Sequence, residues 1–514
     1  MLNQSSTTNS FWDQHRSLLL LTLIFIFLLA AAIRLYKIEA PGMLLERDFG
    51  SAILARDFFF RGEDSIPDWE REMSSKTAQT VPILEPPVTE FLVSLLYRVA
   101  GSEQLWIARV LTSSFWLIGG IFLYKIARSF LATGAAIVST AFYLFAPLGI
   151  LLSRSFQPDA LMMLMFLVSL YAILKYYEQP VTSRLIVAGI ITGLALLYRP
   201  IVLFTLLAAF IALGIAQQRS WKGAFNRQTA IFLTMSLLPP LLYYGYITLL
   251  TDGAQTTMSF QPHLYLRREY WRGWLDSGLY AVGAAAIVVA MLGLAILPLD
   301  WPLAMLSGLW LGYIVFGLTF NYHTQTHPYY QAQLIPIVAL SFGPLVDLIG
   351  DRLRTNPRRH YWILPIGAIM ILGMTLSVLQ VRGVLANPLP VRKETEQAIG
   401  EIVHHSTKAV YVANNYGITL EYNGKLTGSY WPRRIESPLY LSTRGQRILS
   451  IEERLAALNF VPEYFIITNF REYEQNHTDL RDYLDANCSI FSKSDEYLIY
   501  SGCRSLIEDQ VSTN

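Results

Sequence analysis

Three segments of the sequence combine carboxylates with residues that start helices or turns. Glu46-Arg47-Asp48 precedes an amphipathic pattern, Glu85 stands before Pro86-Pro87, and Asp159 follows Pro158. A carboxylate in a fixed position can accept the proton of an attacking hydroxyl group. Each segment also has a purely structural interpretation, because acidic residues favour helix starts and a Pro-Pro pair opens a helix rigidly. Spacing alone leaves both interpretations open.

Arginines accompany these carboxylates. Arg154 stands five residues before Asp159, Arg199 lies between Tyr198 and Pro200, and Arg267-Arg268 occurs in a loop rich in aromatic residues. A guanidinium group matches the oxygens of a phosphate through two parallel hydrogen bonds. The alternative for Arg154 is that it only anchors a helix end by reaching into lipid headgroups.

A fourth segment, His327-Pro328-Tyr329-Tyr330, concentrates rings at one place, four residues after His323. Such a cluster suits an aromatic belt at a membrane interface. Two histidines four apart can also bind a metal ion on one helical face, although Pro328 argues against a regular helix. A divalent metal therefore stays an open possibility, and we assign no metal ligands.

The composition shows which elements position these residues. Of 514 residues, 53% are hydrophobic and only 15% are charged, whereas soluble domains contain about 25% charged residues. This low share of charged residues indicates long apolar segments. The net charge of +2 and the lack of a basic tract give no reason to expect a nucleic-acid partner.

Apolar segments long enough to cross a bilayer, roughly 20 residues each, occur about eleven times. A break between the fifth and sixth is expected at Tyr198-Arg199-Pro200, because proline removes a backbone donor and extends the residue before it. The spans are expected near residues 18–36, 104–124, 131–152, 159–177, 184–198, 200–216, 228–250, 279–297, 301–320, 331–350 and 361–381.

Lysines and arginines near the span ends predict the orientation. Arg16, Lys125, Lys222 and the arginines of 352–359 would lie in the cytoplasm. An odd number of spans then leaves the N-terminus inside and the C-terminal segment outside. The candidate site residues all fall on the outer side in this topology. An interfacial site of carboxylates and arginines suits a substrate with a lipid tail in the bilayer and a phosphate at its surface.

The C-terminal segment has a different character. Lys408–Val412 and Tyr464–Thr468 read as buried strands, and Ile451–Leu458 and Leu480–Leu484 as helical pieces, which predicts a small α/β domain. The expected domains are residues 1–382, membrane-embedded with a long first outer loop at 37–88, and residues 383–514, soluble and outside. Cys488 and Cys503 flank a probable strand and either form a disulfide or remain two core thiols.

The order of these motifs resembles the membrane-embedded GT-C glycosyltransferases that use polyprenyl-phosphate sugars, and most of all the bacterial relatives of protein O-mannosyltransferases and of lipid A aminoarabinose transferase. The resemblance covers roughly residues 15–345. It rests on Asp48, Glu85-Pro86-Pro87, Gly101 with Arg109, Arg154 with Pro158-Asp159, and His327-Pro328-Tyr329-Tyr330 leading to Pro336.

The resemblance implies catalytic roles for Asp48 and Asp159, with Asp48 as the carboxylate base near the acceptor. It implies substrate contacts for Glu46, Glu85, Arg154, Arg199, Arg267, Arg268, His327, Tyr329 and Tyr330. Two positions depart from the pattern: Glu85 stands where relatives often have Lys or His, and Arg199 where they have Lys. The Trp-Trp-Asp signature of oligosaccharyltransferases is absent, which disfavours transfer of a preassembled glycan to asparagine.

The sequence therefore predicts a GT-C-like polytopic helical membrane enzyme with a C-terminal α/β domain, in a bacterial inner membrane. Its activity would be transfer of a sugar from a polyprenyl-phosphate carrier to a hydroxyl of a lipid, glycan or protein, with inversion. Membrane lipids are the expected surroundings. The alternatives are a transporter or flippase of lipid-linked sugars, whose charged groups would lie at mid-membrane, and a non-catalytic membrane receptor.

Overall fold

A computed structural model describes residues 15–40, 45–83, 85–250, 260–355, 391–432 and 449–503, with some helical residues between 368 and 385. The chain divides into two compact units, each described by itself. Residues 1–40, 84–89 and 106–388 form the helical unit, and 41–83, 90–105 and 389–514 form the α/β unit. The first outer loop thus belongs largely to the α/β unit, whereas the boundary expected from the sequence places it with the membrane-embedded part.

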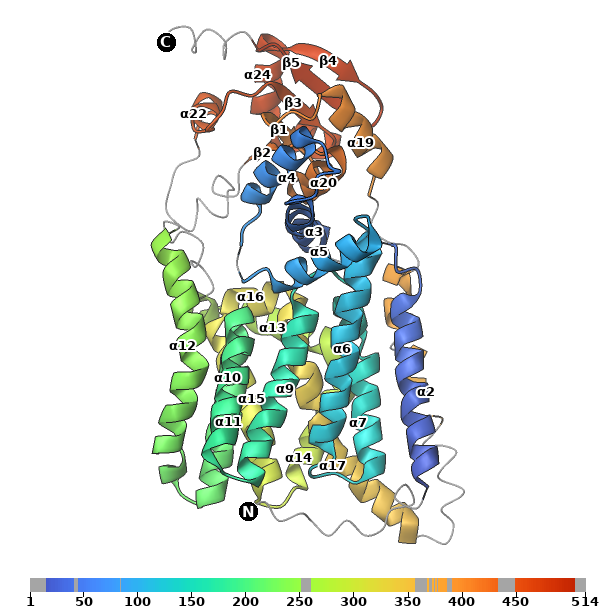
Figure 1. Ribbon diagram of the computed structural model, residues 1–514, viewed down its shortest axis with the longest axis vertical. Coiled ribbons are helices and arrows are strands. Elements are labelled where there is room, and N and C mark those ends of the chain that lie inside the picture. Colours follow the sequence, from blue (N-terminus) through green and yellow to red (C-terminus); the bar gives the residue numbers. More distant parts are fainter. Residues whose placement is uncertain are drawn as a thin grey trace. The chain divides into compact units, whose positions relative to one another are not determined.

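The helical unit is built from long apolar helices (Figure 1). In chain order they are α2 (Arg16–Leu35), α6 (Leu105–Ala127), α7 (Thr133–Phe145), α8 (Pro147–Ser153), α9 (Asp159–Glu178), α10 (Thr182–Tyr198), α11 (Leu203–Gln218), α12 (Arg227–Leu250), α13 (Arg268–Val282), α14 (Ala284–Ala295), α15 (Trp301–Thr319), α16 (Asn321–Thr326) and α17 (Leu334–Thr355). Short 3-10 helices connect some of them: η1 (Pro200–Val202), η3 (Pro262–Leu266) and η4 (Pro328–Gln333).

Within the described residues, seven helices are long and apolar enough to cross a membrane, and two bent pairs pass the same test when each pair is taken as one span. With the shorter α10, these elements coincide with ten of the eleven predicted spans. The eleventh prediction, 361–381, lies largely outside the described residues. The expected fold class, a polytopic helical protein with a C-terminal α/β region, is confirmed.

Two of the predicted spans, 131–152 and 279–297, coincide with bent helix pairs. The first bends by 58° between α7 and α8, where Pro147 begins a new helix. The second bends by 87° at Gly283, whose φ of 82° lies in the left-handed region that glycine tolerates. The sequence interval predicted as one span from 279 therefore contains the end of α13 and the whole of α14.

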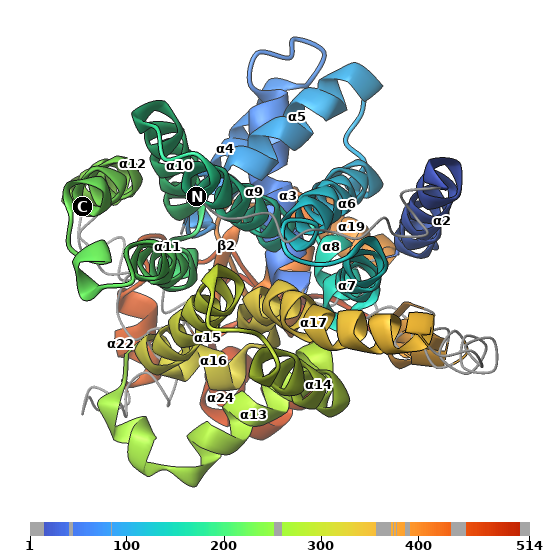
Figure 2. The same ribbon diagram turned by 90° about the horizontal axis from the view of Figure 1, so that it is seen from below.

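Helix α10 packs on its sequence neighbour α9, and helices separated by others in the sequence also pack together, including α11 with α15, α10 with α12, and α17 with α7 and α14 (Figure 2). Small residues allow the closest approach. A Cβ added to Gly312 of α15 would lie 2.4 Å from the carbonyl oxygen of Phe204 on α11, a contact typical of membrane helices. Leucines such as Leu28 on α2 and Leu242 on α12 stay exposed, as expected for surfaces that face lipid.

The α/β unit contains a five-stranded sheet of order β2-β1-β3-β5-β4. Its strands are β1 (Ala409–Val412), β2 (Gly428–Tyr430), β3 (Tyr464–Ile467), β4 (Ser489–Lys493) and β5 (Leu498–Ser501). Strand β1 pairs in parallel with β2 and β3, whereas β5 runs antiparallel to β3 and β4. The two strands and two helical pieces predicted in this segment are present.

Helices cover both faces of this sheet. On one face, α19 (Lys393–Ile402) and α20 (Ile418–Gly424) pack on Tyr411 and Ile466. On the other, α22 (Ile451–Ala456), α23 (Phe470–Asn476) and α24 (Thr478–Asn487) pack on Val412 and Ile467. Alternate residues of each strand therefore enter opposite cores, as the pleat requires.

The first outer loop contributes two helices to the α/β unit, α3 (Leu45–Phe60) and α4 (Asp68–Thr80). Most of α5 (Val88–Ala100), which follows the loop, belongs to the same unit. A helix is present where the pattern predicted one from Asp48 onward, and Ala52, Ala55 and Phe59 on its predicted apolar side are buried, but so are Arg56 and Asp57. This side packs within the unit: α3 contacts α4 and α20, and the ring of Phe49 lies 5.2 Å from that of Tyr422.

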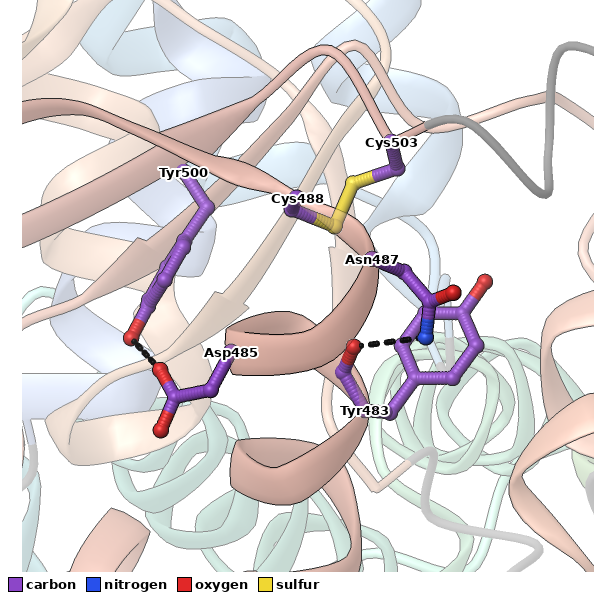
Figure 3. The surroundings of a disulfide bond; sticks show 6 residues. All are labelled: Tyr483, Asp485, Asn487, Cys488, Tyr500 and Cys503. Atoms are coloured by element: carbon purple, nitrogen blue, oxygen red, sulfur yellow. Dashed lines mark hydrogen bonds between the residues drawn. A yellow bond between two sulfur atoms is a disulfide. The ribbon is translucent and has the colours of Figure 1, made fainter.

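Cys488 and Cys503 form a disulfide between the end of α24 and the segment after β5 (Figure 3). Close to it, the hydroxyl of Tyr500 donates a hydrogen bond of 2.7 Å to Asp485. Of the two alternatives left by the sequence, the structure contains the disulfide.

Candidate functional site

Arg199 stands at the break between α10 and α11. Helix α10 ends at Tyr198 and Pro200 begins η1, so Arg199 adopts an extended conformation, as predicted. Its side chain is buried in the helical unit, with only 6% exposed. There the guanidinium Nη2 lies 3.4 Å from both oxygens of Asp159, and Nη1 lies 3.7 Å from Glu85.

Asp159 is the first residue of α9, and 1% of it is exposed. It makes an ion pair with Arg199, and no side-chain capping bond forms at this helix start. Glu85 reaches the same arginine from the segment before α5. Thr89 holds that segment to the end of α10 through a bond of 2.6 Å to the hydroxyl of Tyr198.

Four tyrosines surround this group of charges. Tyr329 and Tyr330 of η4 lie close enough to interact electrostatically with Arg199, and Tyr243 and Tyr244 of α12 with Glu85. We call Glu85, Asp159, Arg199 and these four tyrosines the acidic cluster. The structure thus brings together five of the residues predicted from the sequence: Glu85, Asp159, Arg199, Tyr329 and Tyr330.

Sequence reasoning missed Tyr243 and Tyr244. The only indication was a pair of tyrosines in an otherwise apolar span, three residues after Pro239-Pro240. The hydroxyl of Tyr244 donates to the carbonyl of Leu197 at 3.0 Å, which fixes α12 beside the end of α10.

Aromatic stacking positions the η4 segment. The ring of Tyr330 is nearly parallel to those of His323 and Phe316, with centroids 5.1 Å and 6.2 Å away. His327 contacts Tyr329 edge-on, and its Nδ1 lies 2.7 Å from the hydroxyl of Thr326. In the part of the chain that the structure describes, no group of three His, Cys, Asp or Glu residues has the arrangement of a metal site.

Arg154 and Arg109 bind backbone oxygens at the end of α2. Arg154 Nη2 donates to the carbonyls of Tyr36 and Lys37 at 2.7 and 3.0 Å, and Arg109 Nη1 to those of Ile38 and Glu39. Since Arg154 Nη1 is buried and makes no hydrogen bond to a described residue, one donor of this arginine remains for a ligand.

Arg267 and Arg268 are in a different situation. Both are exposed at the start of α13, and neither forms an ion pair with any described residue. Helix α13 packs on η4, so the two arginines stand at the start of the helix that supports Tyr329 and Tyr330. Of the cations predicted to bind phosphate, these two have the most available donors.

Asp48 and Glu46 belong to the α/β unit. Both lie in the first turn of α3, where Asp48 is buried with 1% exposed and Glu46 is half-buried. One turn later, the hydroxyl of Ser51 donates to Glu90 at 2.6 Å, joining α3 to α5. Asp48 is therefore a buried carboxylate on a well-anchored helix.

The chain resembles known sugar transferases in sequence and in fold. Residues 84–244 match the family model described as dolichyl-phosphate-mannose-protein mannosyltransferase. That interval contains Glu85, Arg154, Asp159 and Arg199. No curated protein sequence shows a significant match over the chain.

Two groups of solved structures share the fold. ArnT from Cupriavidus metallidurans, bound to undecaprenyl phosphate, has a TM-score of 0.58 at 13% identity, covering 94% of this chain and 98% of that one. Without ligand its TM-score is 0.61 at 12% identity, with the same coverage. The Archaeoglobus fulgidus oligosaccharyltransferase tethered to an acceptor peptide has a TM-score of 0.59 at 11% identity, covering 88% and 69%.

These matches confirm the resemblance and the GT-C-like fold predicted from the sequence. Together with the apolar helices, they show an integral membrane protein, and they indicate a glycosyltransferase.

Proposed function

We propose that this chain transfers a sugar from a polyprenyl-phosphate carrier to an acceptor hydroxyl, with inversion at the anomeric carbon. The observation that supports it most is the acidic cluster, a buried guanidinium between two carboxylates in a chain with this fold. The ArnT structure contains undecaprenyl phosphate and an oligosaccharyltransferase structure of Archaeoglobus fulgidus contains dolichol phosphate. A lipid phosphate is therefore the carrier we assign, and the acceptor hydroxyl belongs to a lipid, glycan or protein.

The acidic cluster is suited to hold hydroxyl groups rather than the phosphate itself. One guanidinium faces two carboxylates, so the ionised group carries one net negative charge, which repels a phosphate placed directly on it. Carboxylates held in this way accept hydrogen bonds from sugar hydroxyls. We therefore assign Asp159 and Glu85 to the sugar, and Arg199 to positioning both. Tyr329, Tyr330 and His327 supply aromatic and polar contacts.

Asp48 is the proposed base. A sugar on a phosphate already has a good leaving group, so the main requirement is a carboxylate that accepts the proton of the attacking hydroxyl. The proton passes to Asp48 as the oxygen bonds to the anomeric carbon from the side opposite the phosphate, whose bond to the sugar breaks. Glu46, two residues before Asp48 in the same first turn of α3, is assigned to the acceptor.

The test is Asp48→Asn in the full chain, purified in nanodiscs. The probes are undecaprenyl-phosphate-linked monosaccharides, offered with a cell-envelope extract as acceptor, and release of undecaprenyl phosphate is measured by mass spectrometry. Turnover should fall by about 10²-fold or more, because the amide cannot accept the proton. Binding of the lipid phosphate should persist.

The matched control is Asp57→Asn on the same helix, where Asp57 forms its ion pair among the described residues with Arg61, four residues on. It should retain turnover. If Asp48→Asn releases undecaprenyl phosphate at the wild-type rate, Asp48 is not the base. Binding of the lipid-linked sugars without any release by the wild type would favour a transporter.

The departing phosphate is assigned to Arg267, Arg268 and the remaining donor of Arg154. Arg→Lys at 267 and 268 keeps the charge but loses the two-pronged geometry, so affinity for undecaprenyl phosphate should drop about tenfold, which corresponds to about 1.4 kcal/mol. Arg272→Lys is the control, since Arg272 on the same helix pairs with Asp276. Equal affinities in all these variants would leave these arginines without a role in donor binding.

We also propose that the protein lies in a bacterial inner membrane with its N-terminus in the cytoplasm and residues 389–503 outside. The disulfide supports this side, because disulfides persist in oxidising compartments. A cysteine introduced at exposed Lys493 of β4 should react with a membrane-impermeant maleimide in spheroplasts. If this cysteine reacts only after lysis, the C-terminal domain lies in the cytoplasm and the proposed orientation is wrong.

A further inference from the structure

The C-terminal sheet has a crossover arrangement that creates a crevice at one end. The chain leaves β1 and crosses to β2 through α20 on one face of the sheet, whereas after β3 it crosses to β4 through α23 and α24 on the other face. The connections after the neighbouring parallel strands β1 and β3 therefore diverge. In open α/β sheets, ligands bind at such a switch point, outside the carboxyl ends of the strands.

A pocket of about 90 Å³ lies at this place. Asn414 and Asn415 line it shortly after β1 and Thr468 directly after β3, and the lining also includes Arg392, Thr395, Glu396, Ala413, Thr419 and Glu496. The volume corresponds to about three water molecules at roughly 30 Å³ each. It is enough for one hydroxyl-bearing edge of a small molecule, with the remainder of that molecule lying across the rim.

The wall is already ordered by its own hydrogen bonds. Glu396 accepts from Thr419 at 2.6 Å and from Asn423 at 2.7 Å, one on each carboxylate oxygen. Asn414 accepts from Asn469 at 2.8 Å. These bonds fix where the remaining donors and acceptors point, so a ligand would meet a rigid polar surface.

The loop after β1 is held in an unfavourable backbone conformation. Asn415, Tyr416 and Gly417 all have positive φ, at 51°, 56° and 74°. For residues other than glycine, such angles cost free energy. The conformation projects Asn415 at the pocket, and within the described part of the chain its amide makes no hydrogen bond.

The charges of the wall exclude some ligands. Among the described residues that line the pocket, the one cation is Arg392, which faces Glu496 at 3.8 Å. Two glutamates against one arginine leave an excess of negative charge, which disfavours a phosphate or a nucleotide. Amide and hydroxyl groups, by contrast, pair with sugar hydroxyls, each of which is both donor and acceptor.

An aromatic pair lies beside the loop after β1. Tyr416 directly follows Asn415, is 45% exposed, and contacts Tyr430 at the end of β2 with ring centroids 5.2 Å apart. Exposed rings next to polar groups offer a large apolar contact area with a fixed geometry, which matches the C–H face of a pyranose.

From this combination we infer that the C-terminal α/β domain has a carbohydrate-binding site of its own, at the carboxyl ends of β1 and β3. The ligand class is a neutral sugar, a monosaccharide or the end of a glycan, with its hydroxyl edge on Asn414, Asn415 and Thr468. The site uses none of the residues assigned to transfer. It would tether a glycan to the domain, whether or not that glycan is the acceptor.

The test uses the full chain in nanodiscs and saturation-transfer NMR with methyl glycosides of glucose, galactose, mannose and N-acetylglucosamine. Inorganic phosphate and ADP are tested separately. The first variant is Asn414→Ala combined with Thr468→Val. The second is Asn415→Gly, which removes the amide but retains the positive φ without strain, so the loop remains folded.

The matched control is Ser406→Ala combined with Glu463→Gln, at the amino ends of the same strands, where Ser406 donates to Glu463. At least one glycoside should bind the wild type and the control with equal affinity, and both pocket variants at least tenfold more weakly. No glycoside bound by the wild type, equal binding in the pocket variants, or binding of phosphate or ADP in place of a sugar would overturn the inference. Since transfer is not measured, an error in the role of Asp48 does not affect this result.

Discussion

Two buried arginines, one in each unit, show how differently the same side chain can be held. Arg56 on α3 donates through Nε and Nη2 to both oxygens of Glu103 at 2.8 Å and through Nη1 to the carbonyl of Tyr422 at 2.7 Å. Its guanidinium also lies 3.8 Å from the centre of the Tyr422 ring. Arg199 contacts its carboxylates at 3.4 to 3.7 Å, and its buried Nε makes no hydrogen bond to a described residue.

The difference extends to the balance of charge. Arg56 and Glu103 neutralise one another, and although burial alone would lower the pKa of Arg56, Glu103 raises it above its usual value. Arg199 is shared by two carboxylates. A bidentate, neutral and fully bonded pair suits stability, whereas a long, acidic and incompletely bonded group is suited to a ligand that supplies the missing partners. On these grounds we regard Arg56 as structural and Arg199 as functional.

The largest effect should come from breaking the Arg56 pair. Arg56→Met fills the space but removes two hydrogen bonds to Glu103, which is 23% exposed, and one to the carbonyl of Tyr422. Since hydrogen bonds to charged groups contribute about 1.5 to 3 kcal/mol each, the loss should be about 3 kcal/mol or more. Thermal unfolding of the purified chain should show the transition of the α/β unit at a clearly lower temperature. The double variant Arg56→Met with Glu103→Gln should recover much of the loss. If the single variant unfolds at the wild-type temperature, the pair does not stabilise this unit.

Arg199→Lys should reduce turnover and not stability. An ammonium group cannot span Asp159 and Glu85 as a guanidinium does, so both carboxylates should lose their positions. Turnover should fall by about 10²- to 10³-fold, the range found when one fixed polar contact to the reacting groups is lost. Unfolding temperatures should change little, because the existing contacts are long.

Two measurements separate a positioning role for Arg199 from a merely structural one. Turnover should fall while affinity for undecaprenyl phosphate is retained. Arg184→Lys provides a comparison on α10, where Arg184 binds, among the described residues, the carbonyl of Lys175. A large drop in unfolding temperature for Arg199→Lys, with turnover retained, would show that the two arginines have the same role.

The features that could be predicted from the sequence are those that depend on residues close to one another in the chain. Pro200 extends Arg199, Pro158 precedes the start of α9, and apolar runs give the spans. The bends at Pro147 and Gly283 were not expected, because an apolar run specifies the length of a span but not its direction.

Contacts between distant segments were the other part that sequence reasoning could not supply. Arg56 and Tyr422 are 366 residues apart, and no periodicity connects them. The strands β1 and β3 were predicted from their buried residues. Their neighbours in the sheet depend on crossovers that the sequence does not specify, so the switch point and its pocket appeared only in the structure.

Glu421 on α20 shows a third way to hold a buried charge, close to Arg56 in the same unit. It is 4% exposed, and the hydroxyl of Tyr411 donates to it. Thr80, Thr427 and the backbone of Gly428 also form hydrogen bonds with it. Burial nevertheless dominates and raises the pKa of Glu421 from 4.5 to about 7. Glu421 thus receives hydrogen bonds but forms no ion pair with any described residue.

This shift makes the stability of the α/β unit depend on pH. Below pH 4.5, Glu421 is protonated in both the folded and the unfolded chain and costs nothing. As the pH rises from 4.5 to about 7, the unfolded chain loses this proton while the folded chain retains it, so stability falls. Above about pH 7 both states are ionised and the loss stays constant, at most about 3 kcal/mol. Glu421→Gln stays neutral throughout and should remove this slope.

Calorimetry between pH 4.5 and 8 would measure the effect. At pH 8 the Glu421→Gln variant should unfold at a higher temperature than the wild type, and near pH 4.5 the two should coincide. Glu463→Gln is the contrasting control: although burial opposes it, hydrogen bonds from Ser406 and Lys408 lower the pKa of Glu463. That carboxylate stabilises the fold at neutral pH and ceases to do so as the pH falls, so its slope has the opposite sign. Parallel pH profiles for the wild type and Glu421→Gln would mean that Glu421 titrates normally.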